Sequence, residues 1–278
     1  MKKTLLIAAA ALAASVISSQ AQVYSQNIVG YVNTPLPGGN HLTMIANPLI
    51  GSGGTNGAAQ VLTGLTGGEN LFIWNGAGYY AYTFNGLGVG TGLGFPSDWT
   101  DPNGGAAGSV PGDVYDSGNQ VYWTLPPQLN QGQGAFLQNP NTSFTNTFVG
   151  TVVLSNTAPI VLSGGNALKL VASTVPLGGS LENTNINLPF IGGENIFIWN
   201  GAGYYAYTFN GTGVGTGLGF PSDYTDPNGG AAGSVPGDVY DSVNQVYWTP
   251  LPAVNVGGGF FVQNPNSTEN WSQNLVIP

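Results

Sequence analysis

The sequence predicts an all-β protein made of two tandem homologous domains, each a β-sandwich or a small β-barrel. Two observations support this prediction. Short aromatic and β-branched runs alternate with Gly, Pro and Asn turns, and a long block of sequence occurs twice. Signals for helices are few. The hydrophobic content of 42% favours packed domains over a disordered chain in spite of the 45 glycines.

The duplicated block dominates the chain. Residues 68–124 align without a gap with residues 193–249, and only four positions differ between the two copies. The differing pairs are Leu71/Ile196, Leu87/Thr212, Trp99/Tyr224 and Gly118/Val243. Because the sequence around this block has diverged, either recombination rewrote the block alone or both copies keep one chemistry. The sequence leaves both explanations open.

A shorter pattern sets the domain boundaries. An aromatic residue followed by small polar residues and two apolar residues begins at Tyr24, at Phe144 and at Trp271. We interpret the three copies as related strands at the ends of the domains. The predicted domains are residues 22–148 and residues 149–278, and each is long enough to hold its own core.

Strands are predicted where aromatic and β-branched residues cluster between turns. The strongest signal is a hairpin, in which residues 71–74 and 79–84 flank the short Asn/Gly connection 75–78. Further strands are expected at residues 28–32, 42–46, 120–124, 135–138 and 144–154, and one helical turn at residues 58–62. Residues 86–94 have glycine at every second position, which is typical either of a strand with one bare face or of a flexible loop.

Charge and composition exclude several classes of function. The chain has 3 Lys+Arg against 12 Asp+Glu, one His and no Cys. Such a surface lacks the basic footprint that nucleic-acid binding needs. Without Cys, disulfide scaffolds, zinc–thiolate sites and cysteine nucleophiles are excluded. His41, which Ala167 replaces in the second repeat, is expected to be an ordinary surface residue.

The N-terminus predicts export. Two lysines precede a short apolar stretch and a small-x-small site that ends at Ala21, as in a secretory signal peptide. We therefore expect residues 1–21 to be removed. Loss of Lys2 and Lys3 would take the formal charge from −9 to −11. No later apolar run is long enough to span a bilayer, so the product is expected outside the cell, at the cell surface or in the periplasm.

Acidic residues cluster in the duplicated block, and their carboxylates suggest a calcium site. Carboxylate and amide oxygens are the hard ligands that Ca²⁺ prefers, and few basic residues are present to neutralise them. The candidate ligands are Asp98, Asp101, Asn103, Asp113 and Asp116 in the first copy and Asp223, Asp226, Asn228, Asp238 and Asp241 in the second. The alternative is that these residues only form turns, because Asp-Pro-Asn-Gly is a typical turn sequence.

Aromatic and acidic residues together suggest sugar binding. Most rings are expected in the cores, but Trp99 and its counterpart Tyr224 lie beside turn aspartates, so we predict that they form exposed stacking platforms. Tyr115 and Tyr240 are further glycan-binding candidates. Catalysis would require two carboxylates, such as Asp98 or Asp101 with Asp113 or Asp116, as in a glycoside hydrolase.

The ordered motifs resemble a known group of proteins. Residues 27–32, 42–49, 72–79, 134–140 and 148–152 follow one another as they do in secreted, largely uncharacterised tandem β-repeat proteins of Verrucomicrobia-type Gram-negative bacteria. This resemblance implies an exported β protein and no particular reaction. The chain departs from the group by the Gly- and Asp-rich insert 86–119 and by lacking a hydrophobic C-terminal sorting segment. No anchoring mechanism is therefore transferred.

These observations predict a secreted, non-catalytic protein of the envelope, cell surface or matrix. Its duplicated surface would bind a polysaccharide, another surface protein or a further copy of itself, and two sites could act together by avidity. A calcium-dependent carbohydrate-binding module is the second hypothesis. A carbohydrate-active enzyme that uses paired aspartates is the third.

Overall fold

The computed structural model describes residues 28–51, 54, 56–106, 109–154, 159–182, 186–231 and 233–275. The predicted signal peptide and most of the first copy of the short pattern, residues 24–27, lie outside this part of the chain.

The protein is all-β, with two seven-stranded antiparallel sheets that do not close into barrels, so the two tandem domains are sandwiches. The predicted fold class is confirmed. The first sheet has the order β2-β8-β3-β4-β5-β7-β6, formed by His41–Ala46, Gly134–Asn139, Asn70–Trp74, Tyr79–Phe84, Trp99–Asp101, Val121–Trp123 and Val114–Asp116. The second has the order β11-β19-β13-β14-β15-β17-β16, formed by Ala167–Ala172, Gly259–Asn264, Asn195–Trp199, Tyr204–Phe209, Tyr224–Thr225, Val246–Trp248 and Val239–Asp241.

A hairpin organises the centre of each sheet, as expected. In the first domain β3 and β4 pair from Asn70↔Thr83 to Trp74↔Tyr79. The Asn75 Oδ1 atom accepts hydrogen bonds from the N–H groups of Ala77 and Gly78, at 3.0 and 2.8 Å, which fixes the turn. Alternation along β3 buries Leu71 in the domain core and turns its neighbours to the opposite face.

Each sheet is covered on one face by short elements of its own domain. In the first domain β1 (Val29–Leu36) pairs with β9 (Phe144–Thr151), and α2 (Ala58–Val61) closes the core beside them. In the second domain the cover consists of β10 (Ile160–Leu162) with β20 (Glu269–Trp271) and β12 (Gly179–Ser180) with β18 (Ala253–Val254). Because β9 continues to Thr151, the boundary predicted after residue 148 falls inside a strand.

The second and third copies of the short pattern do not superpose in the structure as they align in sequence. The sequence pattern matches Phe144 with Trp271. In the structure Asn146 is the counterpart of Trp271, because Asn146 donates to the carbonyl of Val61 and Trp271 donates to the corresponding carbonyl of Ile186. The shift of two residues keeps the side chains on the same faces of their strands, since strand side chains alternate with a period of two.

The two domains meet through the other faces of their sheets. Trp74 Nε1 donates to the carbonyl of Leu168 at 3.0 Å, and Trp199 Nε1 donates to the carbonyl of Leu42 at 2.9 Å. The rings of Trp74 and Phe261, and those of Phe136 and Trp199, lie 5.4 Å apart in both cases. Each contact therefore occurs twice with the domains exchanged, which is the pattern of an isologous, two-fold interface.

The sheets approach most closely at a pair of glycines. A Cβ atom on Gly259 would lie 3.2 Å from the Cα atom of Gly134, its counterpart in the first domain. Backbone hydrogen bonds cross the interface nearby, from Ala46 N–H to Gly257 and from Ala172 N–H to Gly132. Glycine suits this place because a side chain on Gly259 would crowd the facing backbone.

Some expected elements differ. Residues 86–94 form turns and the short 3₁₀ helix η2 (Thr91–Leu93), so the strand interpretation of this segment was wrong. Strands β5 and β6, which lie in the Asp-rich region, were not expected. His41 is exposed at the start of β2, as predicted.

Candidate functional site

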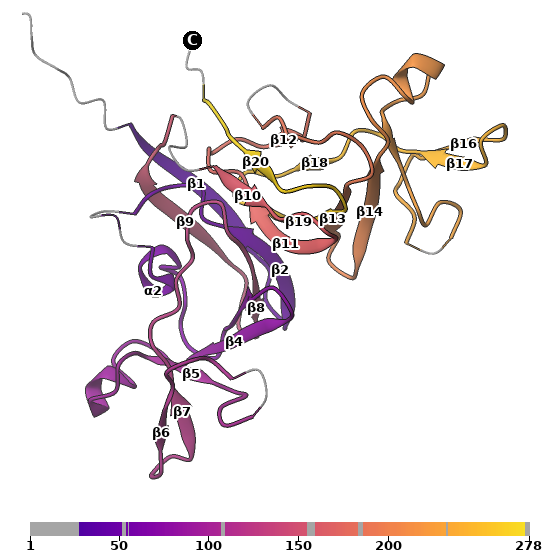
Figure 1. Cartoon of the computed structure of the whole chain (residues 1–278). Helices are drawn as coiled ribbons and strands as arrows, with labels where there is room; N and C mark the ends of the chain where they lie inside the picture. The colour runs from indigo at the N-terminus through magenta and orange to yellow at the C-terminus, as the bar shows by residue number, and fades with distance from the viewer. Residues whose placement is uncertain are drawn as a thin grey trace, which may run out of the picture.

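The part of each duplicated block that follows its central hairpin forms the outer end of the sheet, away from the interface between the domains. We name residues 86–125 the first tip and residues 211–250 the second tip. Strands β6 and β7 extend to one end of the molecule, at the bottom of Figure 1, and β16 and β17 extend to another end at the right. The chain therefore presents nearly the same surface twice, in two different directions.

Asp98 closes the glycine-rich loop of the first tip. Its carboxylate accepts hydrogen bonds from the N–H groups of Gly88, Gly90 and Thr91, at 2.8, 2.9 and 2.9 Å. Burial by itself would raise the pKa of Asp98, but the N–H groups of Thr91 and Gly88 outweigh it and hold the pKa below its usual range. Asp223 has the corresponding contacts in the second tip, and its pKa is lowered for the same reasons.

Asp101 organises the Asp-Pro-Asn-Gly turn from inside. One of its carboxylate oxygens accepts the N–H of Asn103 at 2.7 Å and the other accepts the N–H of Val110 at 2.6 Å. The carboxylate is buried, while Asn103 is exposed. Asp226 repeats both bonds with Asn228 and Val235. A buried carboxylate is satisfied here by backbone donors, which is the structural role of aspartate in turns.

Asp116 fixes the β6–β7 turn and an indole ring. It accepts hydrogen bonds from the Asn119 side chain at 2.8 Å and from Trp123 Nε1 at 3.2 Å. The Asn119 amide is the first reason that the pKa of Asp116 lies below its usual range. Asp241 makes the same bonds to Asn244 and Trp248. By contrast, one oxygen of Asp113 and one of Asp238 are buried without a hydrogen-bond partner.

The ten candidate calcium ligands are thus distributed over separate turns. Within the part of the chain that the structure describes, no three acidic or histidine side chains come together in a geometry that could hold a metal ion. Asp98, Asp101 and Asp116 already accept N–H groups from their own loops. The contacts support the turn interpretation, and calcium binding stays a prediction.

Two of the four aspartates in the first tip, Asp98 and Asp116, are also poorly suited to act as a general acid. A general acid in a glycoside hydrolase needs a raised pKa. The pKa values of Asp98 and Asp116 are lowered instead. These two aspartates are stabilised as anions by N–H donors, which favours a structural role over proton transfer.

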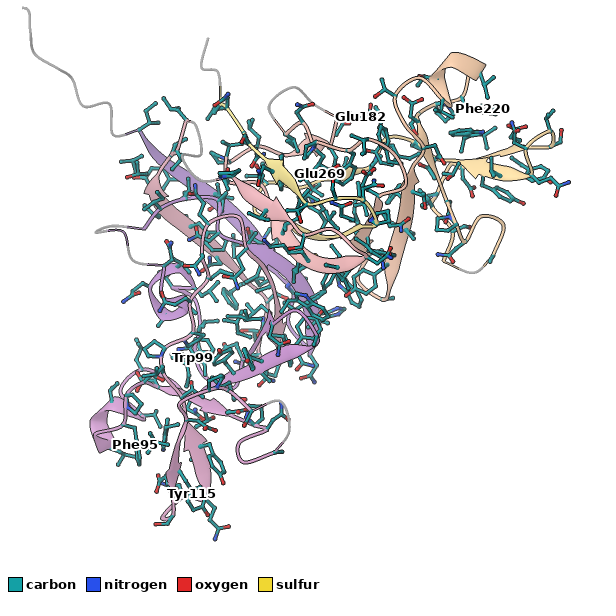
Figure 2. All side chains as sticks on the ribbon, in the orientation of Figure 1. Phe95, Trp99, Tyr115, Glu182, Phe220 and Glu269 are labelled. Atoms are coloured by element: carbon teal, nitrogen blue, oxygen red, sulfur yellow. The ribbon has the colours of Figure 1, made fainter. Side chains whose placement is uncertain are left out.

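The prediction that Trp99 and Tyr224 form exposed stacking platforms is wrong. Their side chains are only 1% and 2% exposed. Trp99 packs on Phe84 with ring centres 5.0 Å apart, and Tyr224 packs on Phe209 at the same distance. The reason is that β5, which begins at Trp99, pairs with both β4 and β7 and directs this side chain into the core. Figure 2 shows Trp99 in the interior of the first domain.

Tyr115 and Tyr240, by contrast, are exposed, each at 51%. Tyr115 lies at the outer end of the first tip (Figure 2) and tilts against Tyr122 with ring centres 4.8 Å apart. Tyr240 and Tyr247 repeat this pair at the same distance. The two tyrosines stay candidates for a binding surface.

Further exposed apolar residues accompany these tyrosines, and sequence reasoning missed them. They occur as matched pairs: Val89 and Val214, Leu93 and Leu218, and Val114 and Val239. The same segments carry stacked aromatic rings, Phe95 on Trp123 at 5.2 Å and Phe220 on Trp248 at 5.3 Å. The signal available in the sequence was that apolar residues continue through an Asp- and Gly-rich segment that would otherwise be a polar loop.

The strands that carry Val114 and Tyr115, and their counterparts Val239 and Tyr240, are at the edges of the sheets. β6 ends the first sheet and β16 ends the second, and each pairs with only one neighbouring strand. In the β6–β7 hairpin Val114 lies opposite Trp123 and Tyr115 lies opposite Tyr122, so exposed apolar side chains occur on both faces. Each tip therefore combines an open sheet edge with exposed apolar side chains.

No helix in the described ranges is long and apolar enough to cross a membrane. Comparison of the chain with protein-family models, with curated protein sequences and with solved structures gives no match.

Proposed function

We propose that this protein is a non-catalytic structural protein of the cell exterior that assembles with copies of itself through its two tips. The observation that supports the proposal most directly is the pair of open edge strands, β6 and β16, which carry the same exposed residues at two ends of one molecule. A chain with two equivalent self-associating ends forms extended assemblies rather than closed dimers.

The edge strands have the chemistry that pairing requires. An edge strand exposes unpaired N–H and C=O groups, and lysine and proline are two of the features by which proteins block such edges. The sequence Val114–Asp116 contains neither, and the three lysines of the chain are at other positions. An antiparallel contact between β6 of two copies would place Tyr115 against its own counterpart and exclude water from both rings.

The charge of the tips sets a condition on assembly. Each tip contains four aspartates and no basic residue, so two tips repel each other at long range. Salt screens this repulsion, since the Debye length falls from about 30 Å at 0.01 M to about 3 Å at 1 M ionic strength. Apolar burial and strand pairing are short-range and are not weakened in the same way. Assembly is therefore expected to increase with salt.

The second hypothesis, glycan binding, rests on the exposed Tyr115 and Tyr240. A tyrosine ring at the end of a tip could stack on a sugar, and two tips would add avidity. The unpaired edge of β6 favours contact with another copy of the chain over a sugar contact, because a sugar would leave the N–H and C=O groups of that edge without strand partners. Self-association is therefore the function we favour.

Sedimentation velocity over a concentration series, at low and at high salt, tests the proposal on residues 22–278. The variants are Val114→Lys, Val239→Lys and the double variant, because a lysine at an edge strand opposes pairing. The wild type should form long assemblies, each single variant should stop at dimers, and the double variant should stay monomeric. Tyr31→Lys is the matched control, since Tyr31 is 70% exposed on β1, away from both tips.

Two results would overturn the proposal. One is a wild type that stays monomeric at every concentration and salt level. The other is a double variant that assembles as the wild type does. Retention of the wild type, but not of a Tyr115→Ala/Tyr240→Ala variant, on an immobilised polysaccharide with calcium present would support the glycan hypothesis instead.

A further inference from the structure

A groove of about 970 Å³ lies between the two domains, beside the outer edge of β11. One wall comes from the end of β3, including Trp74, and the segment before β8, including Gln133. The opposite wall comes from β10, from Ser163 directly after it, and from β11, including Lys169. This volume is at the upper end of the range for small-molecule sites, about 300–1,000 Å³.

Lys169 is the distinctive residue of this groove. It is the only Lys or Arg that follows the predicted signal peptide. Its ammonium group donates one hydrogen bond, to the carbonyl of Val161 at 2.6 Å, and it is half-buried. Among the described residues that line the groove none is acidic, so no lining carboxylate neutralises this cation.

Burial makes the isolated cation costly. Loss of solvent lowers the pKa of Lys169 from its ordinary value, because a charged ammonium is less stable away from water. A negatively charged group in the groove would compensate for this cost with a charge-assisted hydrogen bond, which is about twice as strong as a neutral one. The remaining ammonium protons provide such bonds.

The rest of the lining suits a sugar. Trp74 contributes an aromatic ring that is only partly buried, and Ile160 and Leu170 add apolar surface. Ser163 offers a hydroxyl that can donate and accept, and Gln133 offers its amide N–H donors, since its Oε1 atom already accepts from Asn130. The groove therefore extends around the edge of β11, with the ring of Trp74 on the face of Leu168 and Leu170 and the cation of Lys169 on the face toward β10.

We infer that this groove binds a carboxylated sugar, such as a uronic acid unit of an acidic oligosaccharide, with the carboxylate at Lys169. The site is separate from both tips and does not depend on their self-association. Because the chain carries a formal charge of −9, its surface repels anions in general. Lys169 then makes the groove the place where an acidic ligand is accepted.

The first repeat provides a natural comparison. By the repeat alignment Thr43 occupies the position on β2 that Lys169 occupies on β11, and the indole bonds to Leu42 and Leu168 are equivalent. Lys169→Thr therefore introduces a side chain that this strand environment already accepts in the other domain. The substitution removes the cation and leaves the two-fold interface contacts in place.

Titration calorimetry on the full exported chain, with trigalacturonate as the probe, tests this inference. The fully methyl-esterified trisaccharide is the matched neutral ligand, and Lys169→Arg is the charge-keeping variant. We expect the acid to bind the wild type and Lys169→Arg. Its affinity for Lys169→Thr should be on the order of tenfold or more weaker, as for loss of a hydrogen bond to a charged group. The ester should bind weakly to all three.

Three results would overturn the inference: no heat of binding from the acid with the wild type, equal binding of acid and ester, or unchanged affinity of Lys169→Thr. Thermal unfolding of each variant checks that the fold is retained. The Val114→Lys/Val239→Lys variant should bind the acid as the wild type does. This variant therefore distinguishes loss of self-association at the tips from loss of ligand binding in the groove.

Discussion

Replacement of Trp99 by alanine tests whether its indole ring is part of the core of the first domain. If the ring is part of the core, its removal leaves a cavity beside Phe84; if it were an exposed sugar platform, its removal would change stability very little. The second repeat supplies the matched control, since Tyr224 occupies the same place against Phe209. Trp99→Tyr therefore keeps an aromatic ring that this packing is known to accept.

The expected cost follows from burial. A buried aromatic side chain removes about 150–250 Å² from water, and at about 25 cal/mol per Å² this corresponds to about 5 kcal/mol. The indole Nε1 atom of Trp99 is buried without a hydrogen-bond partner in the structure, which lowers the net contribution by about 1 kcal/mol. Allowing for what alanine still buries, Trp99→Ala should lower the free energy of unfolding by about 3–4 kcal/mol. Trp99→Tyr should cost less than about 1.5 kcal/mol.

Urea unfolding followed by far-ultraviolet circular dichroism measures this difference without relying on the fluorescence of the indole that is removed. The linear dependence of the unfolding free energy on urea gives the change for each variant. A cost below about 1 kcal/mol for Trp99→Ala would refute the reasoning. A cost for Trp99→Tyr equal to that for Trp99→Ala would show that the two repeats do not pack alike at this position.

Two further predictions concern pH and the interface. Because the pKa values of Asp98 and Asp223 are lowered, the stability that they contribute is present above about pH 4 and is lost as pH falls further. Burial raises the pKa of Glu269, so protonation of this group adds stability as pH falls toward about 4.3. The thermal unfolding temperature should therefore be highest in mildly acidic solution. A highest unfolding temperature above neutral pH would contradict these signs. At the interface, Trp74→Phe and Trp199→Phe should each cost about 1–2 kcal/mol in urea unfolding, because each leaves one carbonyl without its indole donor, and clearly unequal costs would argue against two-fold equivalence.

The two-fold interface between the domains explains how two copies of one domain pack together within a single chain. Trp74 with Phe261 and Phe136 with Trp199 have the reciprocal contacts of a symmetric dimer, although both partners belong to one chain. A surface that is complementary to a copy of itself becomes an internal interface when two copies are joined. The joined domains then direct their tips to two different ends, which a single domain could not do.

The sequence by itself determined the fold class, the duplication and most central strands. Period-two runs such as Tyr79–Phe84 are local signals, and the Asn75–Gly78 turn needs no distant contact to form. The helical turn at α2 and the exposed position of His41 were likewise local properties.

Only the tertiary structure decided which residues are available to a partner. Trp99 and Tyr115 are both aromatic residues beside aspartates, yet one is in the core and the other is exposed. The difference depends on β5 lying between β4 and β7 while β6 lies at the edge, and short strands of two or three residues give no periodic signal. The groove at Lys169 likewise depends on the packing of two sheets, so its walls come from segments far apart in the chain.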